Sequence, residues 1–186
     1  MNDFRFVRYD HRRHLEPLFD YMMSPEEQSL FLTHSFSNSI RDFDNWLQNR
    51  LKYHYHEFFV VESLEGELMG VVYSYDHRMQ DGHCRITVYM APKWRRVGYG
   101  GMVGLRFIGQ LFRFYPYHHI FCDVYRYNEE SLNSLLQAGF ENVGTLPQYR
   151  YHNGRYHDLV QLSISRLYYT AHWAALFTPE IAEVQE

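Results

Sequence analysis

The sequence predicts one α/β domain, built on a mixed, mostly antiparallel sheet of about seven strands with helices on both faces. The chain has 186 residues, which is enough for one sizeable core and short for two domains. Runs rich in β-branched and aromatic residues alternate with runs whose apolar residues recur at helical spacing. Two strand-like runs flank Asn153-Gly154, a strong signal for a tight hairpin turn.

The first part of the chain predicts one strand followed by helices. Phe4 to Tyr9 alternates apolar and charged residues, as a half-buried strand does. Leu15 to Met23 predicts a short helix, and Ser24-Pro25-Glu26-Glu27 marks the start of another, because proline and acidic residues favour a first helical turn. A further amphipathic helix is predicted over Arg41 to Tyr53. These helices could form one wall of a substrate cleft.

The middle of the chain predicts antiparallel strands that lead into a glycine-rich turn. Glu57 to Ser63 and Leu68 to Tyr75 are strand-like and are separated by a hairpin signal, and Asp81-Gly82 turns the chain into a strand ending at Met90. The later elements are a helix over Met102 to Phe112, a strand over His119 to Tyr125, a helix over Asn128 to Ala138 stopped by Gly139, and a hairpin of Gln148 to His152 with Arg155 to Ile164. Residues 1–165 are expected to form the domain, and residues 166–186 an aromatic helical extension of unknown role.

Composition narrows the classes of function. Lysine and arginine total 18 against 22 acidic residues, so the net charge of −4 argues against a nucleic-acid-binding protein. The 12 histidines lack the spacing of a metal site, and no metal is predicted. Cys84 and Cys122 lack the pairing of a metal knuckle or a disulfide scaffold and are expected to be free core thiols. Without an apolar signal or spanning segment, a cytoplasmic protein with no membrane partner is expected.

The glycine-rich turn is the strongest functional signal. Ala91 to Gly101 joins a strand to a helix, and the first turn of a helix presents unpaired N–H groups at its positive end. Glycines there let a phosphate approach the backbone closely, and Arg95 and Arg96 add cationic donors. The turn lacks the Gly-Lys-Ser/Thr of a P-loop, which disfavours a nucleotide hydrolase.

Together with the order of elements, this turn resembles the GNAT superfamily of acetyl-CoA-dependent N-acetyltransferases. The family signature, Arg/Gln-x-x-Gly-x-Gly/Ala, is matched by Arg95-Arg96-Val97-Gly98-Tyr99-Gly100. Downstream, Asn128-Glu129-Glu130-Ser131 and Ala138-Gly139-Phe140 are similar to the subgroup of ribosomal-protein and spermidine N-acetyltransferases, as is the final hairpin over Tyr151 to Asp158. The resemblance covers roughly residues 4–165 and implies the fold of that superfamily.

The resemblance implies that an acetyl group moves from acetyl-CoA to a primary amine by direct attack in a ternary complex. The acceptor could be a protein N-terminus, a polyamine or a small amine, and the protein a monomer or a homodimer. The implied cofactor-binding residues lie on the strand end, the turn and the later helix start: Val88, Tyr89, Met90, Arg95, Arg96, Val97, Gly98, Tyr99, Gly100, Gly101 and Asn128.

Two departures from the family pattern affect the catalytic groups. Many members place a Tyr, the acid that protonates departing CoA, where this chain has Leu135, and some relatives have a Glu where this chain has Cys84. These departures keep open an alternative from another class, a non-catalytic acyl-CoA sensor or interaction module.

Candidates for the missing groups remain. Ser131, one helical turn after Asn128, is the first choice as proton donor, because a thiolate with a pKa of about 8.5 needs only a weak acid. His83 is a candidate base, as are His77 and a water held by Tyr73 and Tyr75.

Overall fold

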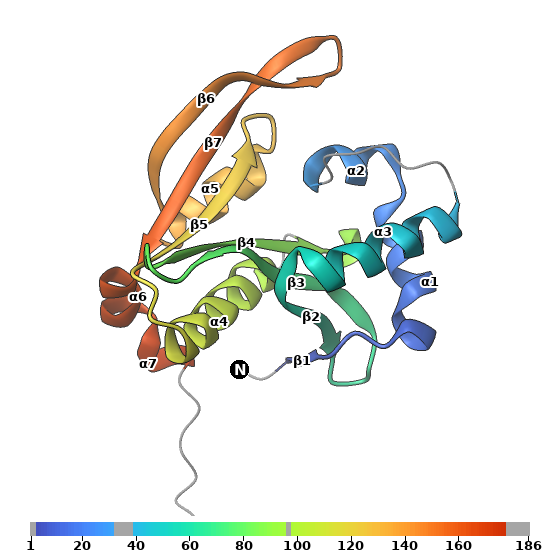
Figure 1. The fold of residues 1–186 in the computed structure, drawn as a ribbon, viewed down its shortest axis with the longest axis horizontal. Coiled ribbons are helices and arrows are strands. Elements are labelled where there is room, and N and C mark those ends of the chain that lie inside the picture. Colours follow the sequence, from blue (N-terminus) through green and yellow to red (C-terminus); the bar gives the residue numbers. More distant parts are fainter. Residues whose placement is uncertain (1–2, 32–38, 96–97, 178–186) are drawn as a thin grey trace, which may run out of the picture.

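In the computed structural model, which describes residues 3–31, 39–95 and 98–177, seven strands form one sheet in the order β1-β2-β3-β4-β5-β7-β6 (Figure 1). Neighbouring strands are antiparallel, except that β4 and β5 run parallel. The predicted mixed, mostly antiparallel sheet is therefore confirmed. The strands are β1 Phe4–Val7, β2 Tyr55–Ser63, β3 Leu68–Arg78, β4 His83–Met90, β5 His119–Tyr125, β6 Glu141–His152 and β7 Arg155–Ser165.

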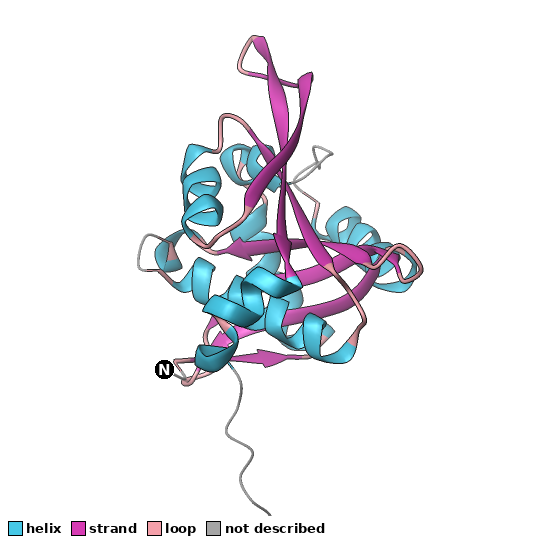
Figure 2. Ribbon diagram, turned by 90° about the vertical axis from the view of Figure 1, so that its left-hand side faces the viewer, coloured by secondary structure: helices cyan, strands magenta, loops and turns pink. Residues whose placement is uncertain are grey.

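Helices cover both faces of the sheet (Figure 2). One apolar cluster joins the inner faces of the helices α1 and α3, through Leu18 and Phe43, to Val60 and Val71 of the sheet. The other joins α4 and α5 to the side chains that point the opposite way along the same strands. The helices are α1 His11–Met22, α2 Pro25–Phe31, α3 Ile40–Tyr53, α4 Tyr99–Phe114, α5 Glu129–Gln137, α6 Arg166–His172 and α7 Ala174–Phe177, with a 3₁₀ turn at Pro92–Trp94.

Two elements, α1 and β6, begin four or more residues earlier than the sequence predicts. α1 begins at His11, because the side chain of Asp10 accepts a hydrogen bond from the Arg13 amide at 3.0 Å and caps the helix. β6 begins at Glu141. Its register shifts twice along Glu141–His152, and the segment includes Pro147, so the regular alternation that predicts a strand is lost.

The two cysteines are free and buried on neighbouring strands, as predicted. Burial raises the pKa of the Cys84 thiol to about 12 and also raises the pKa of Cys122. Within the described ranges, no helix is long and apolar enough to cross a membrane, and no group of three metal-ligating side chains lies together.

A polar cluster lies at the end of β3 farthest from the glycine turn. The His77 ring stacks on that of His56 with centroids 3.9 Å apart, its Nε2 lies 2.9 Å from the Ser74 hydroxyl, and its Nδ1 pairs with the Tyr117 hydroxyl. Burial, followed by the neighbouring His56, lowers the pKa of His77 to about 4. His77 is therefore neutral in the folded protein near neutral pH.

This cluster makes stability depend on pH. In the unfolded chain His77 takes up a proton near its ordinary pKa of 6.5, but in the folded protein only near 4, so acidification across this interval favours unfolding. The free energy of unfolding, measured by urea denaturation, should fall as the pH is lowered from about 7 to about 5. H77Q should flatten this slope, whereas H54Q at an exposed position should not. An equally steep slope in H77Q would contradict the assignment.

Candidate active site

The site begins where β4 and β5 stop pairing. Their parallel register runs only from His83 opposite His119 to Arg85 opposite Phe121. Beyond it, β4 continues on β3 as far as Met90 while β5 continues on β7 as far as Tyr125, and the two strands separate (Figure 1). A gap therefore opens between the carboxyl-terminal halves of the two central strands.

Backbone groups of β4 line this gap. The Ala91 amide donates to the Met69 carbonyl at 2.8 Å, so the backbone N–H and C=O groups of Ala91 point toward β3. The same groups of Tyr89, two residues earlier, also point toward β3. By the alternation of an antiparallel strand, the N–H and C=O groups of Val88 and Met90 face the gap instead. The contact of Val88 and Met90 with an acyl arm stays a prediction. Tyr89, predicted with them, directs its backbone to β3 and its hydroxyl to the Tyr21 carbonyl at 2.9 Å.

The glycine turn follows directly and opens α4. Gly98 adopts φ +85° and precedes the helix without a side-chain cap, so the amides of Tyr99, Gly100 and Gly101 are available to an anion. Among the residues that the structure describes, none lies within 4 Å of a Cβ placed on Gly98 or Gly101. Arg96 and Val97, predicted to bind the pyrophosphate, lie outside the described residues.

Arg95, predicted to contact a phosphate, is bonded to two protein groups in the structure. Its Nε donates to the Met90 carbonyl at 2.8 Å, and both terminal nitrogens pair with the buried carboxylate of Glu27 on α2. Burial by itself would lower the pKa of Arg95, but the hydrogen bonds that Arg95 donates to the Glu27 carboxylate raise it overall. A guanidinium has five N–H groups, so this arrangement leaves N–H groups for a second anion.

α2 also reaches the other strand of the gap. The Tyr127 hydroxyl, just after β5, donates to the Ser29 carbonyl at 2.5 Å. With the Arg95–Glu27 pair, this contact ties α2 to the segments that follow β4 and β5. α2 therefore lies beside the carboxyl-terminal ends of β4 and β5, and the expectation that the early helices form one wall of a substrate cleft stays a prediction. Neither Glu27 nor Tyr127 could be selected from sequence, because no local pattern links α2 to segments so far along the chain.

The predicted residues Asn128 and Ser131 lie at the start of α5, beside the end of β5. Asn128 caps the helix, with its side-chain oxygen accepting from the Ser131 amide at 3.3 Å. Both side chains are half-buried. Leu135 packs against the core cluster under α4, so this position supplies no proton donor. Ser131 stays a prediction as the acid.

His83 is not brought to the gap. It lies at the paired end of β4, four residues before Thr87, which corresponds to about 13 Å along a strand. Its ring packs edge-on against Phe121 with centroids 5.3 Å apart, and its Nδ1 is buried without a hydrogen-bond partner. This position does not suit a base for an amine in the gap. His77, the other histidine candidate, lies in the polar cluster described above.

An ion pair lies at the end of the gap where the pairing of β4 with β5 stops. Arg85 on β4 donates to the carboxylate of Asp123 on β5 at 2.5 Å, and Gln161 of β7 donates to the same oxygen at 3.3 Å. On the same face of the sheet, Tyr73 and Tyr75 carry buried hydroxyls whose pKa is raised by burial. The sequence proposed these two tyrosines as holders of a water, and the structure places them on the strand next to β4.

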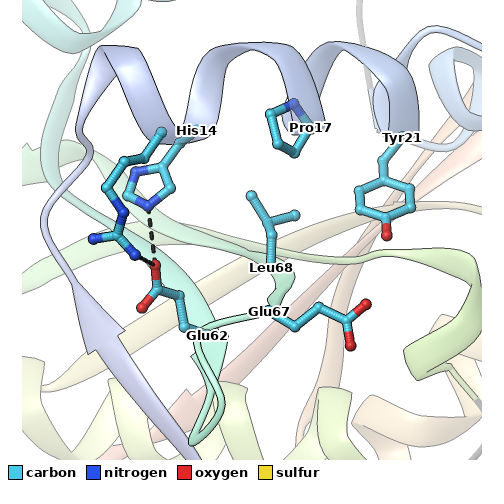
Figure 3. Close-up of a pocket in the computed structure, with 8 residues that line it drawn as sticks. His14, Pro17, Tyr21, Glu62, Glu67 and Leu68 are labelled. Atoms are coloured by element: carbon cyan, nitrogen blue, oxygen red, sulfur yellow. Dashed lines mark hydrogen bonds and ion pairs between the residues drawn. The ribbon is translucent and has the colours of Figure 1, made fainter.

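A separate cavity of about 400 Å³ lies between α1 and the β2–β3 hairpin (Figure 3). In its wall the buried carboxylate of Glu62 accepts from Arg5, from Arg13 and from His14 Nε2. The Asp10 amide donates to His14 Nδ1 at 2.8 Å, so Nε2 carries the proton and His14 is neutral. Burial would raise the pKa of Glu62, but the bonds from His14 and Arg5 lower it overall. This network fixes α1 on the sheet and lies outside the gap.

A mixed sheet whose central parallel strands diverge beside a glycine-rich helix start is the fold of the acyl-CoA N-acyltransferases. The family model of the acetyltransferase (GNAT) domain matches residues 15–160. The chain therefore belongs to the GNAT acetyltransferase family, and it is an enzyme that transfers an acetyl group from acetyl-CoA to an amine. The alternative of a non-catalytic sensor is not supported.

Solved structures share the fold at low sequence identity. Spermidine N-acetyltransferase from Vibrio cholerae, in complex with CoA and spermine, has a TM-score of 0.81 and 18% identity, over 91% of this chain and 99% of that chain. A dodecameric structure of spermidine N-acetyltransferase from Vibrio cholerae has a TM-score of 0.75 and 17% identity, over 91% and 97% of the two chains. No curated protein sequence matches this chain.

The space beside Gly101 gives a test of the cofactor site. G101A should leave the fold intact and keep or raise the melting temperature, because alanine favours a helix by about 1 kcal/mol over glycine. With a phosphate held against this turn, the added methyl group should raise KM for acetyl-CoA by about tenfold. KM for the amine is the internal control. An unchanged KM for acetyl-CoA in a stable variant would place the phosphate elsewhere.

Proposed function

We propose that the acceptor is a polyamine, and that its amine reaches acetyl-CoA in the gap between β4 and β5. The observation that carries the proposal is the set of carboxylates around the gap, which come from three different elements: Glu130 on α5, together with Glu27 on α2 and Asp123 on β5, each of which also pairs with an arginine. A polycation can place one ammonium among carboxylates while another amine reacts. The likeness in fold to an enzyme solved with CoA and spermine supports this assignment.

In this proposal the chain supplies positioning and charge stabilisation. The backbone of Val88 and Met90 would hold the acyl arm, the turn from Arg95 to Gly101 the pyrophosphate, and Asn128 the far side of the arm. The N–H groups on the gap side of β4 would donate to the thioester oxygen as it gains negative charge. The amine nitrogen bonds to the acetyl carbon, the carbon–sulfur bond breaks, and Ser131 would pass its hydroxyl proton to the departing sulfur. The proton that the nitrogen loses would return to Ser131, so the products are the amide and the free CoA thiol and the hydroxyl is restored.

The amine acceptor can be tested with a panel. Release of CoA thiol should be followed with spermidine, spermine, a simple alkylamine and a peptide with a free N-terminus. The two polyamines should have a kcat/KM at least about tenfold above the alkylamine, because only they carry further ammonium groups for the carboxylates. A preference for the peptide would overturn the polyamine assignment and leave the acetyltransferase assignment in place.

Ser131 can be tested separately as the proton donor. S131A should lower kcat at saturating substrates by about tenfold to a hundredfold, with little change in either KM, because the hydroxyl is needed only as the thiolate departs. The cap should survive, since Asn128 bonds to the backbone amide of residue 131 and not to its hydroxyl. Unchanged turnover in S131A would remove this side chain from the mechanism.

We also infer a cytoplasmic location and a monomer or homodimer. The two free, buried thiols are consistent with a reducing compartment. The Vibrio cholerae relative includes a dodecameric form, so light scattering of the purified protein in solution is the direct measurement of assembly.

A further inference from the structure

We propose that Arg166, Tyr168, Tyr169 and Trp173, in the segment 166–177 called here the brace, act as positioning residues for acetyl-CoA by fixing the separation of α4 and α5. This inference rests on the proposed cofactor site, because α4 carries the glycine turn and α5 carries Asn128 and Ser131. The brace comprises α6 and α7 and follows β7 directly. It lies at the ends of α4 and α5 that are opposite to the gap (Figure 1).

Arg166 secures the carboxyl-terminal end of α4. Its guanidinium donates to three backbone carbonyls, those of Tyr117 at 2.6 Å, Tyr115 at 2.5 Å and Phe112. Carbonyls at the end of a helix lack internal partners and carry partial negative charge, so a cation there satisfies both needs. Three bonds from one rigid guanidinium also fix the direction in which the chain leaves α4.

Tyr169 fixes the face of α4 itself. A Cβ on Gly109 would lie 2.2 Å from the Tyr169 hydroxyl, so only glycine allows this approach. Tyr169 is buried and packs on Phe112 with ring centroids 5.5 Å apart. The brace and α4 are thus in direct contact at both the backbone and the core.

The same short segment also holds the end of α5. Tyr168 lies over Gly139, where a Cβ would be only 2.0 Å from its ring and where φ is +92°. Trp173 Nε1 donates to the Ala138 carbonyl at 2.9 Å, at the last turn of α5. Neighbouring residues of one helix, Tyr168 and Tyr169, therefore contact different helices of the cofactor site.

α4 packs more closely on α7 than on α5. The brace therefore adds a direct connection between two helices that otherwise meet through the shared apolar cluster on this face of the sheet. The brace is anchored to the sheet, since Ser165 at the end of β7 accepts from the Tyr168 amide at 3.1 Å. Loosening it would let α5 shift, and with it Asn128 and Ser131, relative to the glycine turn.

The test compares Y168L/W173F with the control L167A, whose side chain is 82% exposed on the same helix. In the double variant, the Kd for CoA measured by calorimetry and the KM for acetyl-CoA should both rise by about fivefold or more. The KM for the amine should stay within about twofold of wild type, and L167A should match wild type throughout.

The outcomes separate this role from simple support of the fold. Partial unfolding lowers the active fraction and therefore kcat, without changing KM or the Kd of the folded fraction. A folded double variant with wild-type affinity for CoA would overturn the brace. Failure of wild type to bind CoA would instead refute the cofactor site, and binding of CoA without acetylation of polyamines would refute only the acceptor.

Discussion

The early end of the β4–β5 ladder is the constraint on which the site depends. Each of the two strands is hydrogen-bonded along its outer edge, β4 to β3 and β5 to β7. These pairings hold β4 and β5 apart beyond Arg85 and Phe121, where their own pairing ends. Backbone groups of a buried strand need partners, and those of Val88 and Met90 have no neighbouring strand on the gap side. The sheet thereby presents hydrogen-bonding backbone to a ligand at its centre, held rigidly from both sides.

The surrounding elements follow from this gap. Arg95 donates hydrogen bonds to both the Met90 carbonyl and the Glu27 carboxylate, so one side chain links the strand end, the glycine turn and α2. Because Glu27 is buried, its charge requires a partner, and Arg95 provides a bidentate one. Tyr127 repeats the link from the β5 side. α2 is therefore attached to the segments that follow both strands of the gap.

The sequence reveals the donor half of the site better than the acceptor half. The glycine turn and its flanking strand are consecutive in the chain, and the strand His119 to Tyr125 was predicted with the bounds found for β5. The Glu27–Arg95 and Arg85–Asp123 pairs join residues far apart in sequence, and no local periodicity encodes such contacts. The length of β6 is underestimated from sequence for a related reason, because its register shifts interrupt the alternation of side chains that marks a strand.

The carboxylates at the gap impose opposite requirements on the acceptor. An alkylamine with a pKa of about 10.4 costs about 4 to 5 kcal/mol to deprotonate at pH 7, and a neighbouring carboxylate would increase this cost while strengthening binding. In an acceptor with one amine, the same nitrogen is bound more strongly by a carboxylate and costs more to deprotonate beside it. A polyamine separates them, because its distant ammonium groups can bind at the carboxylates while the attacking amine lies among neutral groups such as Tyr73 and Tyr75. Burial keeps those hydroxyls protonated, so they do not stabilise the ammonium form of the nucleophile.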